Sequence, residues 1–295
     1  MPRLGAHLSA AGGLWRAPEA AAALGCRALQ IFLRAPARWA RAALPAGGAE
    51  RFRAAAAGAS LDGACFAHAP YLLNLASADH GLRRRSLAVL VEELERAGEL
   101  GLAGVVLHPG SAGAGDRGEA EARCRDGIAE AVDTAGAAAA PLLLEGTAGM
   151  GGQLGITPAE LARLVAPSVA GRVGLCLDTA HLWAAGYDLH GDGWERVLGE
   201  ASGHWPAGAL RLLHINDTAV ECGSRRDRHA PPGEGRLGRH FYRRLFADPC
   251  VTGLPCVLEI PPGDDNRLVR VALARLRRWS APATTGTARR RPRRR

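Results

Sequence analysis

Several features that would define the class of this protein are missing from its sequence. No apolar run approaches the roughly 20 residues of a membrane-spanning helix, and the opening residues MPRLGAHLSAAGG lack the apolar core of a signal peptide. The seven cysteines are scattered and include no Cys-x-x-Cys pair, which disfavours a disulfide framework and a thiolate metal site. No Gly-x-Gly-x-x-Gly motif follows the first predicted strand, which disfavours a dinucleotide-binding fold. We therefore expect a soluble cytoplasmic protein with reduced cysteines.

Lysine is absent as well, so all 37 basic residues are arginine. Six of these arginines stand in ARRRPRRR at 288–295, and without them the formal net charge falls from +8 to +2. Net charge is therefore weak support for nucleic-acid binding by the folded part. Residues 280–295, rich in Pro, Thr, Gly and Arg, are predicted to form a disordered Arg-rich tail, and residues 1–279 a single domain. The tail either adds non-specific affinity for polyanions or has no specific function.

Short apolar runs alternate with longer segments of helical character. The helical segments include Arg83–Leu100 and Pro158–Val165, each long enough to cross back over a sheet. Alternating strands and helices predict a parallel sheet, and eight such units predict a closed (β/α)8 TIM barrel. The eight apolar runs are RLGAHLS, ALQIFL, GACFAHAP, GVVLHPG, PLLLEG, VGLCLDTAH, LRLLHIND and PCVLEIP.

Ionisable side chains stand at or near the carboxyl end of seven of these runs, and only ALQIFL lacks one. Closure of a barrel brings the carboxyl ends of all strands to one rim, where barrel enzymes place their active sites. Grouping carboxylates and imidazoles away from water is costly unless cations neutralise them. The sequence therefore predicts bound cations among His7, His68, His108, Glu145, Asp178, His214 and Glu259.

Three further residues extend the set of candidate ligands. His181 follows Asp178 in DTAH, and Asp227 and His229 form an Asp-x-His pair in the loop SRRDRHAPPGEG. Nitrogen and oxygen ligands without thiolate suit zinc, with manganese or iron as partial substitutes. We interpret His7 as a packing or hydrogen-bonding residue and GEGRLG at 233–238 as a turn. The nine remaining ligands are too many for one ion and predict two or three: His68, His108, Glu145, Asp178, His181, His214, Asp227, His229 and Glu259.

The motifs around these residues resemble those of the endonuclease IV family. They occur in the family's order and spacing from Gly5 to about Leu276. The resemblance implies a (β/α)8 barrel with three zinc ions that cleaves double-stranded DNA at abasic sites, and we expect a monomer. The motifs are GAHLSAAGG, HAPYLLNL, HPG, LEGTAGMGGQLG, GLCLDTAHLWAAGYD, HINDT, DRHAPPGEG and LEIP.

The resemblance also implies a role for each ligand. Glu145 would bridge two of the ions and be the catalytic carboxylate. The reaction would hydrolyse the phosphodiester 5′ to the abasic site and leave a 3′-hydroxyl and a 5′-deoxyribose phosphate. The implied ligand sets are His68, His108 and Glu145 for the first ion, Glu145, Asp178, His214 and Glu259 for the second, and His181, Asp227 and His229 for the third.

DNA contacts are expected on three loops, one of which is RAPARW with Arg34 and Arg38. By resemblance, Tyr71 and Leu72 would be wedges that hold the base-less sugar out of the duplex, unless they pack under their loop instead. The arginines that flank the Asp-x-His pair, Arg225, Arg226 and Arg228, would lie close to the DNA backbone.

The chain departs from the family pattern at three positions. In the second rim loop, RAPARW, Ala35 and Ala37 replace the usual asparagine and inserted arginine, and Arg34 or Arg38 would substitute for them. Gly146 replaces the usual asparagine after the catalytic glutamate. We expect catalysis to survive these changes and affinity or lesion preference to differ.

Two other functions fit parts of the pattern. A sugar isomerase or epimerase of a related barrel type would use one or two metal ions and would not need His181, Asp227 and His229 as a third site. A non-catalytic basic binding module is supported only by the arginine-rich tail.

Overall fold

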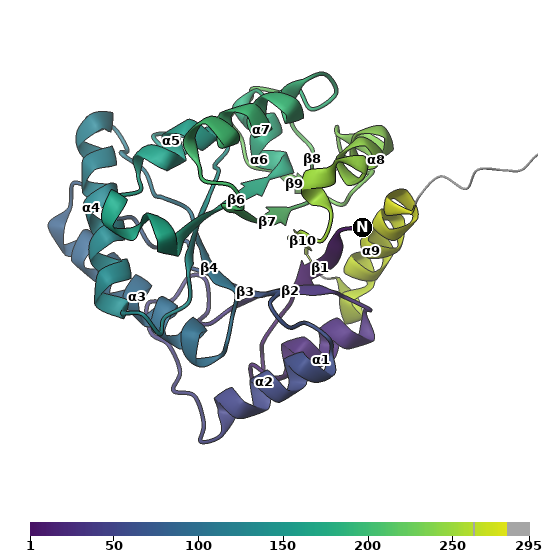
Figure 1. The fold of residues 1–295 in the computed structure, drawn as a ribbon, viewed down its shortest axis with the longest axis horizontal. Helices are drawn as coiled ribbons and strands as arrows, with labels where there is room; N and C mark the ends of the chain where they lie inside the picture. Colours follow the sequence, from purple (N-terminus) through teal and green to yellow (C-terminus); the bar gives the residue numbers. More distant parts are fainter. Residues whose placement is uncertain (262, 282–295) are drawn as a thin grey trace, which may run out of the picture.

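Eight parallel strands close into a barrel in the computed structural model, which describes residues 1–261 and 263–281. The strands lie side by side in the order β1-β10-β7-β6-β5-β4-β3-β2, and helices surround them (Figure 1). The predicted (β/α)8 barrel is therefore confirmed. Its strands are β1 Arg3–His7, β2 Ala28–Phe32, β3 Cys65–His68, β4 Gly104–Leu107, β5 Leu142–Glu145, β6 Val173–Asp178, β7 Leu210–His214 and β10 Pro255–Leu258.

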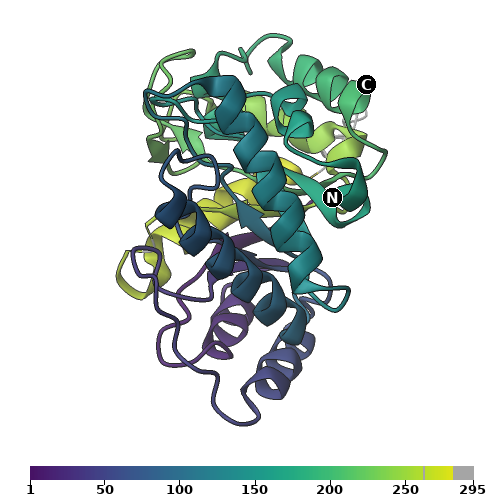
Figure 2. The same cartoon turned by 90° about the vertical axis from the view of Figure 1, so that its left-hand side faces the viewer.

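The helices cover the outside of the barrel. The two longest described helices, α3 and α4, pack side by side (Figure 2). No described helix is both long enough and apolar enough to cross a membrane. The α-helices are α1 Arg16–Ala23, α2 Gly48–Gly58, α3 His80–Glu99, α4 Arg117–Ala135, α5 Pro158–Arg163, α6 Thr179–Ala185, α7 Gly193–His204, α8 Gly238–Ala247 and α9 Arg267–Ser280, with short 3-10 helices η1 Pro167–Arg172, η2 Pro249–Val251 and η3 Asp264–Asn266.

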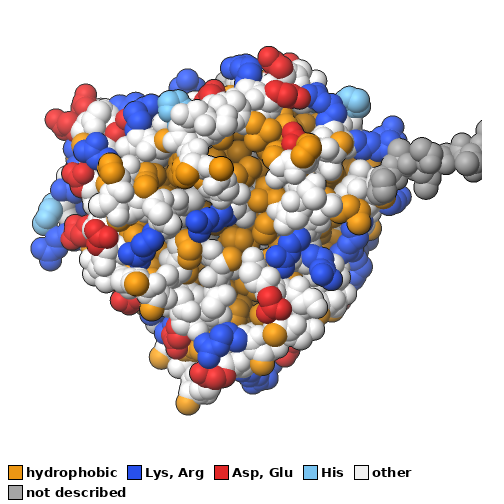
Figure 3. All heavy atoms as spheres, viewed as in Figure 1, with side chains coloured by type: hydrophobic (Ala, Val, Ile, Leu, Met, Phe, Trp, Pro, Cys, Tyr) orange, Lys and Arg blue, Asp and Glu red, His pale blue; other side chains and the backbone are white. Residues whose placement is uncertain are grey.

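Helix α9 ends at Ser280, one residue beyond the predicted domain boundary, and residues 282–295 of the predicted tail lie outside the described residues. On the face seen in Figure 3, charged side chains lie mainly around the outline and hydrophobic side chains occupy much of the middle. Charged side chains on the outer surfaces of the helices are expected for amphipathic helices, because such helices pack their apolar sides inward.

Local sequence fixes where several rim loops end and helices begin. Asp79, Asp116 and Thr157 each accept a hydrogen bond from the backbone N–H three residues later, at 2.8–3.1 Å. These contacts satisfy N–H groups that the first helical turn leaves without a partner. The starts of α3, α4 and α5 are therefore set by single side chains.

The barrel interior has its own apolar cluster, separate from the core between strands and helices. Side chains alternate between the two faces of a strand, so interior positions recur every second residue. The cluster consists of Ala28, Phe66, Val106, Leu143, Cys176, Leu212 and Val257, with Ala64 two residues before Phe66.

The next interior position is polar in all eight strands. It lies two residues beyond Gly5 in β1 and, in the other strands, two residues beyond Ala28, Phe66, Val106, Leu143, Cys176, Leu212 and Val257. This layer forms the carboxyl-terminal rim of the barrel. The change from apolar to polar at a spacing of two is visible in the sequence and explains why the candidate ligands converge. The polar rim layer consists of His7, Gln30, His68, His108, Glu145, Asp178, His214 and Glu259.

One element was not predicted. A two-stranded antiparallel hairpin pairs β8 Asp217–Thr218 with β9 His229–Ala230 and carries the loop that contains Asp227. Two-residue strands are too short to give a periodic signal in the sequence. The predicted turn at 233–238 is present, because the buried Asp217 carboxylate accepts hydrogen bonds from the backbone N–H groups of Gly233 and Leu237, both at 2.8 Å.

All seven cysteines lie within the described residues and are free thiols. Five of them are buried. Burial raises the pKa of the Cys65, Cys124 and Cys176 thiols to about 12, which keeps them protonated. As predicted, several cysteines are core residues.

Gly5 in β1 generates the first testable prediction. A Cβ at this position would lie 1.8 Å from the backbone oxygen of Ala28 in the neighbouring strand, where neither strand can move without opening the barrel. We expect Gly5→Ala to lower the free energy of unfolding by at least about 3 kcal/mol, measured by urea denaturation. Gly199→Ala is the control, because no heavy atom lies within 4 Å of its Cβ in the middle of α7. This control should stabilise by about 0.5–1 kcal/mol, and equal effects of the two changes would contradict the account.

Candidate metal centre

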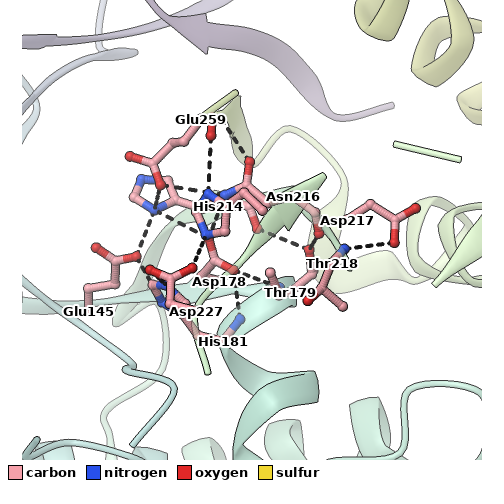
Figure 4. Close-up of polar contacts among 12 residues, drawn as sticks. Glu145, Asp178, Thr179, His181, His214, Asn216, Asp217, Thr218, Asp227 and Glu259 are labelled. Atoms are coloured by element: carbon pink, nitrogen blue, oxygen red, sulfur yellow. Dashed lines mark hydrogen bonds and ion pairs between the residues drawn. The ribbon is translucent and has the colours of Figure 1, made fainter. Parts of the chain in front are cut away.

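The nine candidate ligands come from seven segments and meet at the carboxyl end of the barrel. Six belong to strands β3, β4, β5, β6, β7 and β10 or to the residue that directly follows the strand. His181 lies on α6, which begins directly after Asp178, and Asp227 and His229 lie on the β8–β9 hairpin. Figure 4 shows Glu145, Asp178, His214 and Glu259 pointing toward one another.

The first group consists of His68, His108 and Glu145, whose ligand atoms all lie within 4.8 Å of one another. The Oε2 atom of Glu145 is 3.2 Å from Nε2 of His68 and 2.9 Å from Nε2 of His108. These three residues are the set predicted for one ion.

The second group contains Glu145, Asp178, His214 and Glu259, again within 4.8 Å. Nδ1 of His214 lies 2.9 Å from Oε1 of Glu145 and 3.0 Å from Oε2 of Glu259. Glu145, which is 0% exposed, therefore presents one oxygen to each of the first two groups. This is the arrangement expected of a carboxylate that bridges two ions.

The third group differs in part from the predicted set. Asp178, His181 and His229 have ligand atoms within 4.8 Å of one another, so Asp178 belongs to this group as well as to the second. Asp227 joins through its carboxylate oxygens, 3.3 Å from Nε2 of His181 and 3.2 Å from Nε2 of His229.

Four of the ligand imidazoles are oriented by an acceptor on their outer nitrogen. Nδ1 of His68 donates to the Ala69 carbonyl at 2.6 Å. Nδ1 of His181 donates to the Gly146 carbonyl at 2.8 Å, and Nδ1 of His229 donates to the Glu259 carbonyl at 3.1 Å. His214 is bound at Nε2 instead, by the side-chain oxygen of Gln30 at 2.9 Å. In each ring the other nitrogen therefore carries the lone pair and faces the carboxylates.

The charges of the site hold its carboxylates ionised. Burial by itself would raise the pKa of Glu145, but the neighbouring His214 and His108 outweigh burial and place that pKa well below its usual value. Burial has the same tendency at Glu259, and His214 again lowers its pKa well below the usual range. Burial would also raise the pKa of Asp227, but the neighbouring His181 outweighs burial and lowers that pKa to about 2.

The imidazoles respond in the opposite direction. Burial would lower the pKa of His214, but the facing Glu259 and Glu145 carboxylates raise it well above the usual value. Burial likewise opposes protonation of His181, and Asp178 and Glu145 outweigh it. Without another cation, the site therefore draws protons onto its imidazoles.

These residues fit divalent cations. Imidazole lone pairs and carboxylate oxygens are both acceptors, so their contacts at about 3 Å require a proton or a metal ion between them. The Nε2 atom of His229 is buried without a hydrogen-bond partner among the described residues, as expected for a ligand atom. Cys176 also lies within 4.8 Å of Glu145 and His214, but its raised pKa disfavours the thiolate form that binds metals.

Two amide side chains of the site were missed from the sequence. Gln30 occupies the polar rim position of β2, the strand whose apolar run carries no ionisable side chain, and contacts Glu259 at 2.6 Å. Asn216 donates to Asp178 at 2.5 Å, and its side-chain oxygen accepts from the Glu259 backbone N–H at 2.8 Å. The spacing of two residues between interior positions could have identified Gln30. Asn216 lies two residues beyond His214 but past the end of β7, where the strand period no longer applies.

The predicted DNA-contact residues have different surroundings. The Tyr71 side chain is 61% exposed at the edge of the site, with its ring 5.2 Å from that of His68, and Leu72 is half-buried. The side chains of Arg38, Arg225, Arg226 and Arg228 are exposed.

The prediction that Arg34 contacts DNA is not supported. Its side chain is 1% exposed and forms ion pairs with Glu92 at 2.8 Å and Glu93 at 2.7 Å on α3. The guanidinium also donates to the Trp39 carbonyl. Burial beside two carboxylates therefore commits Arg34 to holding the β2–α2 loop against α3.

The three residues that depart from the family pattern, Ala35, Ala37 and Gly146, have different surroundings. Ala35 is exposed and lines a mainly apolar hollow of about 850 Å³ between the loops that follow β1 and β2, next to Tyr71 and Glu259. Ala37 is exposed on the same loop. At Gly146 a Cβ would find only ordinary contacts at 3.9 Å or more, and the contact to His181 comes from the backbone oxygen. The side chain at position 146 is therefore not needed to orient that imidazole.

Comparisons with known proteins show which proteins this chain resembles. The family described as "Xylose isomerase-like TIM barrel" matches residues 18–279. A protein named "Probable endonuclease 4" from Nitratidesulfovibrio vulgaris strain Hildenborough is 42% identical over 282 residues, covering 94% of this chain and 99% of the relative.

Two solved structures are also similar to this chain. Endonuclease IV from Thermus thermophilus is 38% identical, has a TM-score of 0.81, and is matched over 94% of this chain and 100% of its own. A D-tagatose 3-epimerase-like protein has a TM-score of 0.69 at 19% identity over 93% of this chain and 98% of its own, a likeness of fold alone.

The raised imidazole pKa values predict how pH affects stability. In the metal-free protein, His181 and His214 stabilise the fold fully below about pH 6.5, and this contribution is lost as pH rises through their higher folded pKa. Zinc replaces the protons, and its affinity grows as the imidazoles lose them. We expect the difference in Tm between zinc-loaded and chelator-treated protein to widen from about pH 6 to about pH 9. Thermal unfolding followed by circular dichroism measures it, and a constant or shrinking difference would contradict the assignment.

Proposed function

The chain belongs to the endonuclease IV family, and from that membership we propose that it is a DNA-repair endonuclease that hydrolyses the phosphodiester 5′ to abasic sites in duplex DNA. The products would be a 3′-hydroxyl and a 5′-deoxyribose phosphate. Three zinc ions would serve as cofactors, with manganese or iron as partial substitutes, in a cytoplasmic monomer.

The position of Glu145 is the observation that carries the proposal. Its two oxygens face two separate groups of imidazoles and carboxylates, and a third group on α6 and the β8–β9 hairpin adjoins them. A cluster of cations is suited to phosphodiester hydrolysis because positive charge is needed on several oxygens of the same phosphate.

His68, His108 and Glu145 would hold one ion, Asp178, His214 and Glu259 would complete a second site with Glu145, and His181, Asp227 and His229 would hold a third. When bound, the ions supply Lewis acidity to the attacking water and to the phosphate oxygens. The protein's own contribution is orientation. Hydrogen bonds on the outer nitrogens aim the inner lone pairs of His68, His181, His214 and His229 into the centre, which leaves none of these imidazoles to act as general base.

Exposed side chains on two sides of the centre support a DNA-binding role. Tyr71 projects beside His68 and His108, which suits a wedge between base pairs. The hairpin arginines Arg225 and Arg226 and, on the β2–α2 loop, Arg38 would contact phosphates.

The sugar isomerase or epimerase remains the second candidate, favoured only by likeness of fold. Such a reaction does not require Asp227 and His229, which contribute to the third group here. Elemental analysis discriminates between the two, because one zinc per chain would favour the isomerase.

Glu145→Gln tests the catalytic centre. The amide keeps the size of the side chain but removes the charge shared by the first two groups, so we expect cleavage of an oligonucleotide duplex with one abasic site to fall by about 10³-fold or more. A chelator should abolish cleavage by the unaltered protein. The control is Glu50→Gln, a surface position 70% exposed on α2, which should cleave normally. Substantial cleavage by the Glu145 variant would contradict the assigned role.

The double variant Arg225→Gln/Arg226→Gln tests the DNA-facing side of the hairpin. If each arginine neutralises one phosphate, the slope of log Kd against log salt should decrease by about 2, and binding should weaken for all sequences alike. Fluorescence anisotropy on a metal-loaded Glu145→Gln background would measure binding without cleavage. Arg125→Gln on α4 is the control, and an unchanged slope in the double variant would exclude the proposed contacts.

A further inference from the structure

Gln30 lies on β2, which like β1 supplies none of the nine candidate ligands, and its side chain is 0% exposed. Its amide nonetheless joins three residues of the rim layer. The side-chain nitrogen donates to Oε1 of Glu259 at 2.6 Å and to Nδ1 of His7 at 3.0 Å. The side-chain oxygen lies 2.9 Å from Nε2 of His214.

These contacts permit only one arrangement of hydrogens. The Glu259 carboxylate can only accept, so the NH₂ end of the amide must face it and the oxygen must face His214. Nε2 of His214 must then carry the proton. In the neutral or metal-bound ring the lone pair is left on Nδ1, the atom that faces Glu145 at 2.9 Å and Glu259 at 3.0 Å.

His214 differs in this respect from the other oriented imidazoles. His68, His181 and His229 donate to backbone carbonyls, which remain in place whatever side chains the chain carries. His214 depends on a side chain, and both it and Gln30 are fully buried, so bulk water has no access to replace the amide.

We propose that Gln30 is a positioning residue of the second metal group. It selects the His214 tautomer with the proton on Nε2 and holds the Glu259 carboxylate in place, so that both residues present their ligand atoms before an ion binds. This inference rests on the proposed metal-dependent function but concerns a residue outside the ligand set.

Two near-isosteric substitutions separate the two contacts. Gln30→Met removes the acceptor for His214 and the donor for Glu259. Gln30→Glu keeps an acceptor for His214 but places a second carboxylate where Glu259 now accepts a hydrogen bond at 2.6 Å. Loss of the group that orients a metal ligand typically weakens metal binding by about 10–100-fold, and we expect a loss in this range at one site per chain in both variants.

The experiment measures zinc affinity and stoichiometry by competition with a chromophoric chelator. In parallel, ¹⁵N-histidine NMR of the zinc-loaded protein reports the tautomer of His214 and the hydrogen bonding of its Nε2–H. We expect Gln30→Met to weaken one site and to move the Nε2–H signal away from its hydrogen-bonded position, and Gln30→Glu to weaken the same site while that signal stays hydrogen-bonded. A substitution that only disturbs packing would not separate the two variants in this way.

Gln153→Met is the matched control. Gln153 is the other glutamine of the chain, and its side-chain oxygen accepts from the Met150 backbone away from the ligands. The Gln153→Met variant should leave zinc affinity and the His214 signal unchanged. Wild-type affinity together with a wild-type His214 signal in Gln30→Met would overturn the proposal, and if that variant does not fold, unaltered affinity in Gln30→Glu would do so.

Failure of this inference is distinguishable from failure of the proposed function. An unaltered protein that binds zinc at several sites but does not cleave abasic DNA would refute the nuclease and leave the role of Gln30 standing. If instead the unaltered protein cleaves abasic DNA while both Gln30 variants bind zinc normally, the role of Gln30 is refuted and the nuclease stands.

Discussion

The structure depends on one contact that cannot exist without a cation. Glu145 is fully buried, and its two oxygens face the inner nitrogens of His68, His108 and His214 at about 3 Å. Hydrogen bonds on the outer nitrogens of His68 and His214 prevent those rings from turning their N–H groups inward. Protons or metal ions must therefore occupy the space between these acceptors. The same need is seen in the pKa values, because that of Glu145 lies well below its usual value and that of His214 lies well above it.

Much of the fold and most of the candidate ligands could be predicted because both follow from the period of a strand. Interior positions recur every second residue, so an apolar residue such as Val106 and the polar His108 two positions later must point the same way. Gln30 obeys the same rule but escaped notice because a neutral amide is not recognised as part of a charged site. The β8–β9 hairpin escaped because its strands are two residues long.

Tertiary burial explains the prediction that was not supported. From the sequence, Arg34 is one more arginine on a rim loop, and nothing nearby in the chain indicates that Glu92 and Glu93 will pack against it. The ion pairs form only when α3 docks beside the loop, across about 60 positions of sequence. Arg85, also on α3, lies over the Trp39 ring at 4.3 Å and strengthens the same attachment. The loop that departs from the family pattern is thus attached to α3 by the buried Arg34 and by the exposed Arg85.

Some ligand imidazoles are oriented by backbone atoms and one is oriented by a side chain. This difference explains where the site tolerates change. Gly146 lacks the side chain usual in the family, yet His181 keeps its orientation because the partner is the carbonyl oxygen of residue 146. The same reasoning applies to His68 and His229, whose partners are also backbone atoms. His214 has no such protection, and it belongs to the group that shares Glu145 with its neighbour. A neutral glutamine in a strand without a ligand is therefore as constrained chemically as the charged residues around it.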